Sequence, residues 1–155
     1  MFSVASYDRR KFGRGVEIIL MFIGITALFG GGMIYLAFRD TTLRMFDWYE
    51  ALGLIDVVDN LRYLCRDMRP GDFMLYNLPD LLWIISYLLF VNALIPISYR
   101  KTYLFWVFLM PILAIGHEIM QAFGLANGKF DVIDLSCYIV PLTINLIYYR
   151  YEKKL

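Results

Sequence analysis

Four long stretches of mainly apolar residues divide the chain, and each contains few charged side chains. They cover residues 16–38, 78–98, 103–124 and 131–149. A helix needs about 20 apolar residues to cross roughly 30 Å of bilayer hydrocarbon, so each stretch is long enough to span a membrane. Backbone groups in lipid have no water to bond, and no stretch alternates apolar and polar residues as a barrel strand does. We therefore predict four transmembrane helices.

The segment between the first two stretches, residues 40–76, has a different pattern. Its apolar positions recur at helical spacing and are Leu54, Val57, Val58, Leu61, Leu64, Cys65 and Met68. Its charged positions fall mainly on the other side of the helical wheel. The pattern predicts an amphipathic helix over 54–68, which lies on the outer membrane surface, covers the bundle like a lid, or simply packs onto the bundle. A second short helix is expected over 41–52, ending near Gly53.

Composition agrees with this pattern, because 60% of the residues are hydrophobic and 17% are aromatic. The net charge of +1 gives no reason to expect nucleic acid as a partner. The predicted fold class is all-α: a polytopic membrane protein with an amphipathic extracytoplasmic helical segment between its first and second transmembrane helices. Residues 1–155 are expected to form a single membrane domain.

Basic residues cluster at one side of the predicted bundle. They are Arg9, Arg10, Lys11, Arg14, Arg100, Lys101, Arg150, Lys153 and Lys154. Because cytoplasmic loops carry an excess of Lys and Arg, both termini are predicted to be cytoplasmic. The first apolar stretch is too long for a signal peptide and no convincing cleavage site follows it, so we interpret it as an uncleaved anchor.

The polar residues of the predicted spans converge on the opposite, outer side. They are Asp80 at the start of the second span, His117, Glu118 and Gln121 near the end of the third, and Asp131 and Asp134 at the start of the fourth. Residues three or four positions apart share one face of a helix, so His117, Glu118 and Gln121 are neighbours. Lys129, in the short linker before the fourth span, is expected to project among these carboxylates.

Several of these side chains have a structural alternative. Asp131 with Asp134, and Asn77 with Asp80, have the spacing of a helix-capping pair. Asp134 could also favour the positive end of the helix dipole.

Glu118 lies inside its helix, where no cap explains it and where a charge costs at least ~2.5 kcal/mol. We therefore expect it to face a polar cavity, paired with His117, Gln121, Lys129 or an aspartate across the bundle. His117 is equally compatible with a bond to a neighbouring helix, and Lys129 with either neutralising the carboxylates or binding an anionic headgroup.

The chain contains no cofactor or metal signature. Its two cysteines have no paired metal spacing, and it lacks a glycine-rich phosphate loop, a serine elbow and a complete His-Glu-x-x-His motif. We therefore expect no metal and no cofactor.

The stretch "HEIMQAFGLANGKFDVIDL" (117–135) resembles the core motif of the VanZ-like family of small bacterial membrane proteins. The matching positions are Glu118, Gln121, Gly128 with Lys129, and Asp134, while "NLPDLLWIISYLLF" (77–90) resembles the family's polar helix entry, with Asp80 as the matching acid. The family usually has an arginine where this chain offers Lys129. The resemblance implies a multi-pass protein of the bacterial cytoplasmic membrane, in a family associated with resistance to the antibiotic teicoplanin, and it supplies no reaction.

Three hypotheses for function follow. The leading one is a non-catalytic envelope protein that binds a membrane lipid, or a lipid-linked or amphipathic envelope molecule, in an outer-leaflet polar pocket. Its expected ligand-binding residues are Asp80, Glu118, Gln121, Lys129, Asp131 and Asp134. A second is an enzyme acting on a lipid, with Glu118 and His117 as general base and acid. A third is a small subunit that assembles with a membrane-protein partner.

Overall fold

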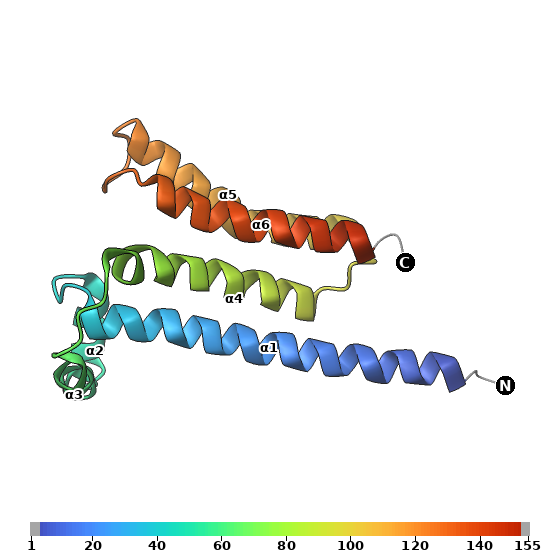
Figure 1. The fold of residues 1–155 in the computed structure, drawn as a ribbon, viewed down its shortest axis with the longest axis horizontal. Helices are drawn as coiled ribbons and strands as arrows, with labels where there is room; N and C mark the ends of the chain where they lie inside the picture. The colour runs from blue at the N-terminus through green and yellow to red at the C-terminus, as the bar shows by residue number, and fades with distance from the viewer. Residues whose placement is uncertain (1–3, 153–155) are drawn as a thin grey trace.

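The computed structural model describes the backbone of residues 4–152 and the side chains of residues 14–152. This part is helical, with no strand. Its elements are α1 (Val4–Phe38), α2 (Arg44–Ala51), α3 (Ile55–Cys65), the π-helical turn η1 (Phe73–Asn77), α4 (Leu78–Leu94), α5 (Arg100–Ala122) and α6 (Val132–Glu152). The four long helices run along the molecule, with α2 and α3 at one end and both chain ends at the other (Figure 1). We call these the α2–α3 end and the terminal end.

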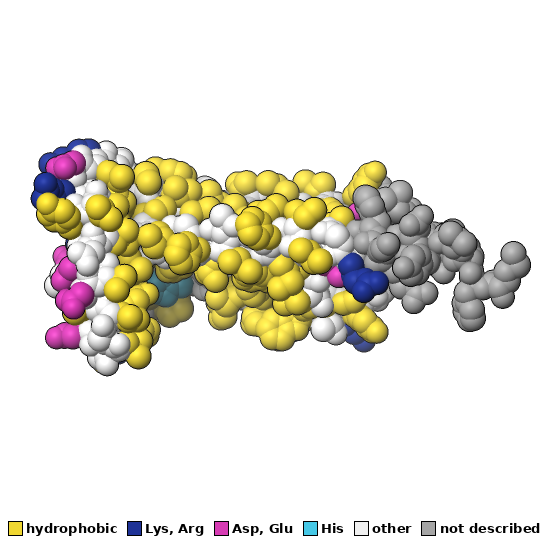
Figure 2. Space-filling model, turned by 90° about the horizontal axis from the view of Figure 1, so that it is seen from below, with side chains coloured by type: hydrophobic (Ala, Val, Ile, Leu, Met, Phe, Trp, Pro, Cys, Tyr) yellow, Lys and Arg dark blue, Asp and Glu magenta, His cyan; other side chains and the backbone are white. Residues whose placement is uncertain are grey.

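Four helices are long and apolar enough to cross a membrane, which confirms the predicted multi-pass membrane architecture. They cover Arg14–Phe38, Phe73–Leu94, Arg100–Ala122 and Val132–Glu152. On the face shown in Figure 2, hydrophobic side chains cover the middle of the molecule and the charged side chains that are drawn lie towards its ends. Ile18, Phe22 and Phe29 are each more than half exposed, as expected for side chains that face lipid.

The second span differs most from its predicted limits of 78–98. It begins at Phe73, because η1 continues directly into α4, and it ends at Leu94. Pro96 explains the early end, because proline lacks an N–H and disfavours helical geometry in the residue before it.

Helix α4 is the centre of the bundle. It packs against α1 on one side and against α5 and α6 on the other, whereas over residues 4–152 no Cα atom of α1 lies within 8 Å of one in α5 or α6. In Figure 1, α1 and α4 lie side by side. The packing therefore leaves a space beside α4 between α1 and α6.

Two glycines of α1 allow it to approach α4 closely. A Cβ atom added at Gly31 would lie 2.7 Å from Nε1 of Trp83, and one at Gly24 would lie 2.9 Å from the Phe90 ring. Lipid tails are as apolar as the helix side chains, so the hydrophobic effect does not drive transmembrane helices together. They associate instead through close packing at small residues such as these glycines.

Replacing Gly31 by Leu is expected to force α1 away from α4 and to lower stability by about 1–3 kcal/mol, the usual cost of overpacking. Gly32→Leu is the matched control, because an added Cβ there meets nothing within 4 Å in the described structure. Thermal unfolding of both variants in mild detergent measures the difference. Equal melting temperatures would contradict the close approach.

At the terminal end, three polar side chains join α4, α5 and α6. The Tyr103 hydroxyl donates to Asn92 Oδ1 (2.6 Å), the Asn92 amide donates to Asn145 Oδ1 (2.5 Å), and the Asn145 amide donates to the Tyr103 oxygen (3.2 Å). Tyr103 is fully buried and its ring stacks on Tyr149 at 5.2 Å between centroids. This ring of hydrogen bonds fixes the three helices relative to one another far from the α2–α3 end.

Candidate functional site

A polar cavity of about 860 Å³ lies at the α2–α3 end, where α1, α4, α5 and α6 meet. The structure brings all the candidate residues from the sequence to this one cavity. Lining it are Asp80, His117, Glu118, Gln121, Lys129, Asp131 and Asp134. Tyr35, Arg39 and Tyr76 complete the wall from the side of α1 and η1. We call this space the polar cavity.

Asp131 is the N-cap of α6. Its Oδ1 accepts a hydrogen bond from the backbone N–H of Ile133 at 2.8 Å, and its carbonyl oxygen accepts one from the N–H of Leu135 at 3.1 Å. A cap of this kind satisfies a backbone donor that the first turn of a helix leaves free. The capping interpretation of Asp131 therefore holds, although its carboxylate also lines the polar cavity.

Glu118 connects α5 to the start of α6. Its side chain is only 5% exposed, and its Oε2 accepts a hydrogen bond from the backbone N–H of Asp131 at 3.3 Å. The carboxylate thus lies at the N-terminus of α6, where the helix dipole favours negative charge. One of the sequence alternatives paired Glu118 with an aspartate across the bundle. The partner is indeed an aspartate, Asp131, but Glu118 bonds its backbone N–H rather than its side chain.

Asn77 ties η1 to the same helix start. It is 3% exposed, and its amide donates to Asp134 Oδ1 at 2.7 Å and to Asp131 Oδ2 at 3.3 Å. The idea that Asn77 and Asp80 form a capping pair is wrong. Because η1 runs directly into α4, Asn77 does not lie at a free helix end, and its side chain makes no capping bond.

Asp80 lines the polar cavity from α4 without an ion pair. It is half-buried, and the Tyr138 side chain lies beside it. Within residues 14–152, Arg66 and Asp67 are the only oppositely charged side chains that approach within 4.0 Å. Asp80 and Lys129 therefore face the cavity without a direct charge partner in the described chain.

Arg39, directly after α1, is a cavity residue that sequence reasoning missed. Its guanidinium carbon lies 4.9 Å from the Tyr35 ring centre and 5.1 Å from that of Tyr76, within the range of cation–π attraction. The neighbouring Asp40 is engaged elsewhere, because it accepts a hydrogen bond from the Thr42 N–H at 2.9 Å, which lowers the pKa of Asp40. The sequence feature that could have identified Arg39 is a cation directly after an apolar span, at the side of the bundle where the acidic residues lie.

Gln121 and His117 are neighbours on α5, as their spacing predicted. The Gln121 Nε2 lies 3.3 Å from His117 Nδ1 and donates to the Asn127 carbonyl at 3.1 Å. Gly128, with φ of +121°, permits this approach, because a Cβ there would collide with the Gln121 amide. No hydrogen bond joins His117 to Glu118 in the described chain, and no three His, Cys, Asp or Glu side chains there are grouped to hold a metal ion.

Helix α3 packs on α1 and does not cover the polar cavity. Its Arg62 donates from Nη1 to the carbonyl oxygens of Leu36 (3.0 Å) and Arg39 (2.9 Å), which lie at the C-terminal end of α1. Such carbonyls have no partner within their own helix. Over residues 14–152, no side chain of α2 or α3 lines the cavity. The contact with α1 agrees with the alternative of a helix that packs onto the bundle, and α3 does not line the polar cavity as a lid would. Arg62 also fixes the backbone of Arg39.

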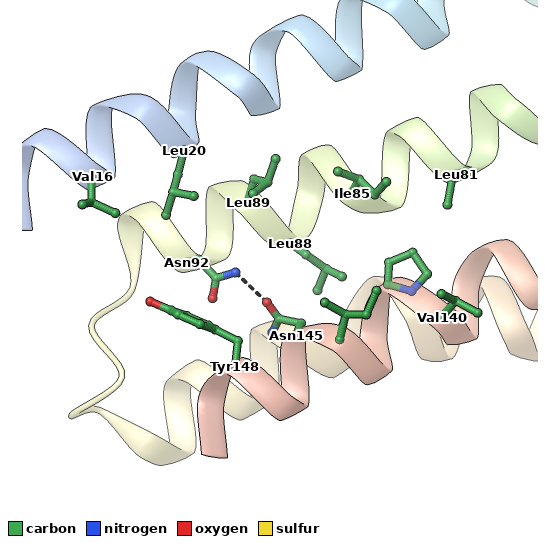
Figure 3. A pocket seen from close by; sticks show the side chains of 12 residues that line it. Val16, Leu20, Leu81, Ile85, Leu88, Leu89, Asn92, Val140, Asn145 and Tyr148 are labelled. Atoms are coloured by element: carbon green, nitrogen blue, oxygen red, sulfur yellow. Dashed lines mark hydrogen bonds between the residues drawn. The ribbon is translucent and has the colours of Figure 1, made fainter. Parts of the chain in front are cut away.

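A second cavity, of about 550 Å³, is apolar and lies between α1, α4 and α6. Figure 3 shows Leu20 of α1, Leu89 of α4 and Val140 of α6 around it, with the Asn92–Asn145 hydrogen bond near its terminal end. It lies where the backbones of α1 and α6 are more than 8 Å apart. It shares no lining residue with the polar cavity over the described chain.

Comparison with known proteins identifies no relative: no family model, no curated protein and no solved structure matches the chain.

Proposed function

We propose that the protein binds a membrane lipid, or another lipid-linked or amphipathic molecule, with the polar head of that molecule in the polar cavity. The observation that carries this proposal is that Arg39, Lys129 and Asp80 line one cavity and none has an oppositely charged side chain within 4.0 Å in the described chain. Groups that merely stabilise a bundle are expected to pair with one another, because unpaired charge near hydrocarbon is costly.

The cavity residues divide into a framework and a ligand-binding set. Asp131 uses both carboxylate oxygens on protein donors, so we assign it to the framework. Glu118 and Asp134 each use one oxygen on a protein donor, which leaves the other for a hydroxyl or amine of the ligand. Arg39 and Lys129 are the groups for an anionic part of the head, such as a phosphate.

We further propose that the protein lies in the bacterial cytoplasmic membrane with both termini cytoplasmic, which places the polar cavity in the outer leaflet. Arg100, Lys101 and Arg150 at the terminal end support this orientation through the positive-inside rule. Arg9, Arg10, Lys11, Lys153 and Lys154 also belong to that cluster, but their side chains lie outside the described residues. The sequence resemblance to the VanZ-like family supports the same envelope location.

The two cysteines test the orientation. Cys65, at the end of α3, is partly exposed, whereas Cys137 is buried in α6. A membrane-impermeant maleimide added to intact cells is expected to label the wild type and Cys137→Ser equally, and to leave Cys65→Ser unlabelled. Labelling of Cys65 only after the cells are opened would reverse the orientation and move the cavity to the cytoplasmic leaflet.

Native mass spectrometry of the protein, extracted gently from its own membrane, tests the function. The wild type is expected to retain a discrete lipid-sized mass, and Asp80→Ala is expected to lose most of it. Asp67→Ala is the matched control, because Asp67 is a 91% exposed carboxylate outside the cavity. A wild type with no bound lipid would contradict the proposal, and a stoichiometric protein partner in its place would favour the membrane-subunit hypothesis.

A further inference from the structure

A third cavity, of about 290 Å³, lies beside the polar cavity, between α4 and α5. The two cavities share three lining residues, Asp80, His117 and Tyr138. The rest of the lining is mainly apolar and includes Ile84 of α4 and Leu113 of α5. The polar cavity thus adjoins a mainly apolar one, which we call the α4–α5 groove.

The α4–α5 groove faces the lipid. Leu113 is 59% exposed, Met110 is 44% exposed and Trp83 is 36% exposed, although all three line the groove. Leu113 lies roughly 14 Å along α5 from the helix end at Ala122, given a rise of 1.5 Å per residue. That depth is well within the hydrocarbon of one leaflet.

A hydrogen bond joins α4 to α5 on the terminal side of the groove. The Tyr87 hydroxyl donates to the Trp106 carbonyl oxygen at 2.5 Å and joins α4 to α5. Beyond this bond, Pro111 interrupts the backbone hydrogen bonding of α5, a feature that bends helices. In Figure 1, α5 rises away from α4 towards its C-terminal end, where the shared residue His117 lies.

Two other apolar cavities overlap less with the polar cavity, whereas a small one at the α2–α3 end, lined by Leu43 and Leu75, shares Arg39 and Tyr76 with it. The cavity of Figure 3, between α1, α4 and α6, shares no lining residue with the polar cavity over the described chain. A further cavity beside α1 and α2 shares only Tyr35, whose ring stacks on Trp83 at 4.9 Å between centroids.

We infer that the α4–α5 groove holds a hydrocarbon chain of the lipid whose head occupies the polar cavity, and that this lipid enters sideways from the membrane between α4 and α5. The inference rests on the proposed function and specifies its ligand as a lipid with a phosphate head. Arg39 and Lys129 supply the donors for the phosphate, and Leu113 and Ile84 contact the chain.

Photolabelling of the wild-type protein tests the position of the chain. The probe is dodecyl phosphate with a diazirine in its alkyl chain, added to protein in mild detergent and irradiated. Peptide mapping is expected to place most of the adducts on Met110 and Leu113. Adducts mainly on Val140 and Ile144, which border the α1–α4–α6 cavity or lie exposed on α6, or evenly on all lipid-facing helices, would overturn the inference.

A pair of filling variants gives the matched control. Ala114→Trp fills the α4–α5 groove, and Ile144→Trp fills the α1–α4–α6 cavity. We expect Ala114→Trp to reduce labelling about tenfold, which corresponds to about 1.4 kcal/mol of binding free energy, and Ile144→Trp to leave it unchanged. Leu113→Trp replaces Ala114→Trp if that variant does not fold, as judged by its melting temperature.

The failure of this inference is distinguishable from failure of the proposed function. If the wild type retains lipid in native mass spectrometry but Ala114→Trp and Leu113→Trp both label normally, the polar cavity still binds lipid and the α4–α5 groove is not its chain site. If the wild type neither retains lipid nor reacts with the probe above the level of the Arg39→Ala and Lys129→Ala double variant, the proposed function itself fails.

Discussion

Replacing Arg39 or Lys129 by alanine is expected to weaken binding of dodecyl phosphate about tenfold each, while the bundle stays folded. Hydrogen bonds to charged groups contribute about 1.5–3 kcal/mol, and a tenfold change in affinity corresponds to about 1.4 kcal/mol. Neither cation has a carboxylate within 4.0 Å in the described chain. Removing either one therefore breaks no ion pair and leaves no carboxylate without its partner. Titration by native mass spectrometry measures the affinities.

Arg66→Ala is the control for the loss of one positive charge at the same end. Arg66 pairs with Asp67 at 3.6 Å and does not line the polar cavity. Its removal is expected to leave affinity unchanged, and Lys129→Arg is expected to restore most of the binding lost in Lys129→Ala. Full affinity in both Arg39→Ala and Lys129→Ala, with the variants folded, would show that neither cation meets the ligand.

Replacing Asn145 by alanine is expected to lower the free energy of unfolding by about 2 kcal/mol. The substitution leaves the Asn92 amide and the Tyr103 hydroxyl without their shared partner. Interhelical hydrogen bonds in membranes contribute about 0.6 kcal/mol on average and up to about 1.7, and here two are lost together with packing volume. Reversible unfolding in mild detergent measures the change.

Thr143→Ala is the matched control on the same helix. The Thr143 hydroxyl is exposed and bonds only the Ile139 carbonyl of its own helix, so its loss is expected to change stability by less than ~0.5 kcal/mol. Binding of dodecyl phosphate per folded molecule is expected to be the same in both variants, because the Asn145 network lies at the terminal end. A stable Asn145→Ala protein would mean that the network is not needed to hold α4, α5 and α6 together.

The four membrane spans were predictable because hydrocarbon imposes long apolar runs, and the structure has all four. Their exact ends were less predictable. The start at Phe73 depends on the π-helical turn η1 merging with α4, which apolar periodicity does not indicate. The end at Leu94 had a visible cause in Pro96, two residues later.

The meeting of Asp80, Glu118 and Asp131 in one cavity followed from topology. Successive spans run in opposite directions, so the end of one and the start of the next lie at the same side of the membrane. The partners within the cavity did not follow. Whether Glu118 meets a side chain or the Asp131 N–H depends on helix tilt and rotation, which the sequence pattern leaves open.

Two further features depended on tertiary contacts that spacing does not encode. Tyr35 precedes Arg39 by four residues on α1, but the contact of Arg39 with Tyr76 of η1 is between positions far apart in the sequence. The place of α3 depends on Arg62 reaching the last carbonyls of α1, a contact between positions more than twenty residues apart. Amphipathic periodicity predicted that α3 has an apolar face, but not which surface that face covers.

The most direct test of lipid binding in the polar cavity is a crystal structure of the wild-type protein grown from a lipid phase that contains dodecyl phosphate. We predict density for the phosphate within hydrogen-bonding distance of Arg39 and Lys129, continuous with density for the alkyl chain between α4 and α5. A cavity that contains only water, with Arg39 and Lys129 turned onto Asp80 and Asp134 as ion pairs, would contradict lipid binding and identify the charged residues as bundle framework.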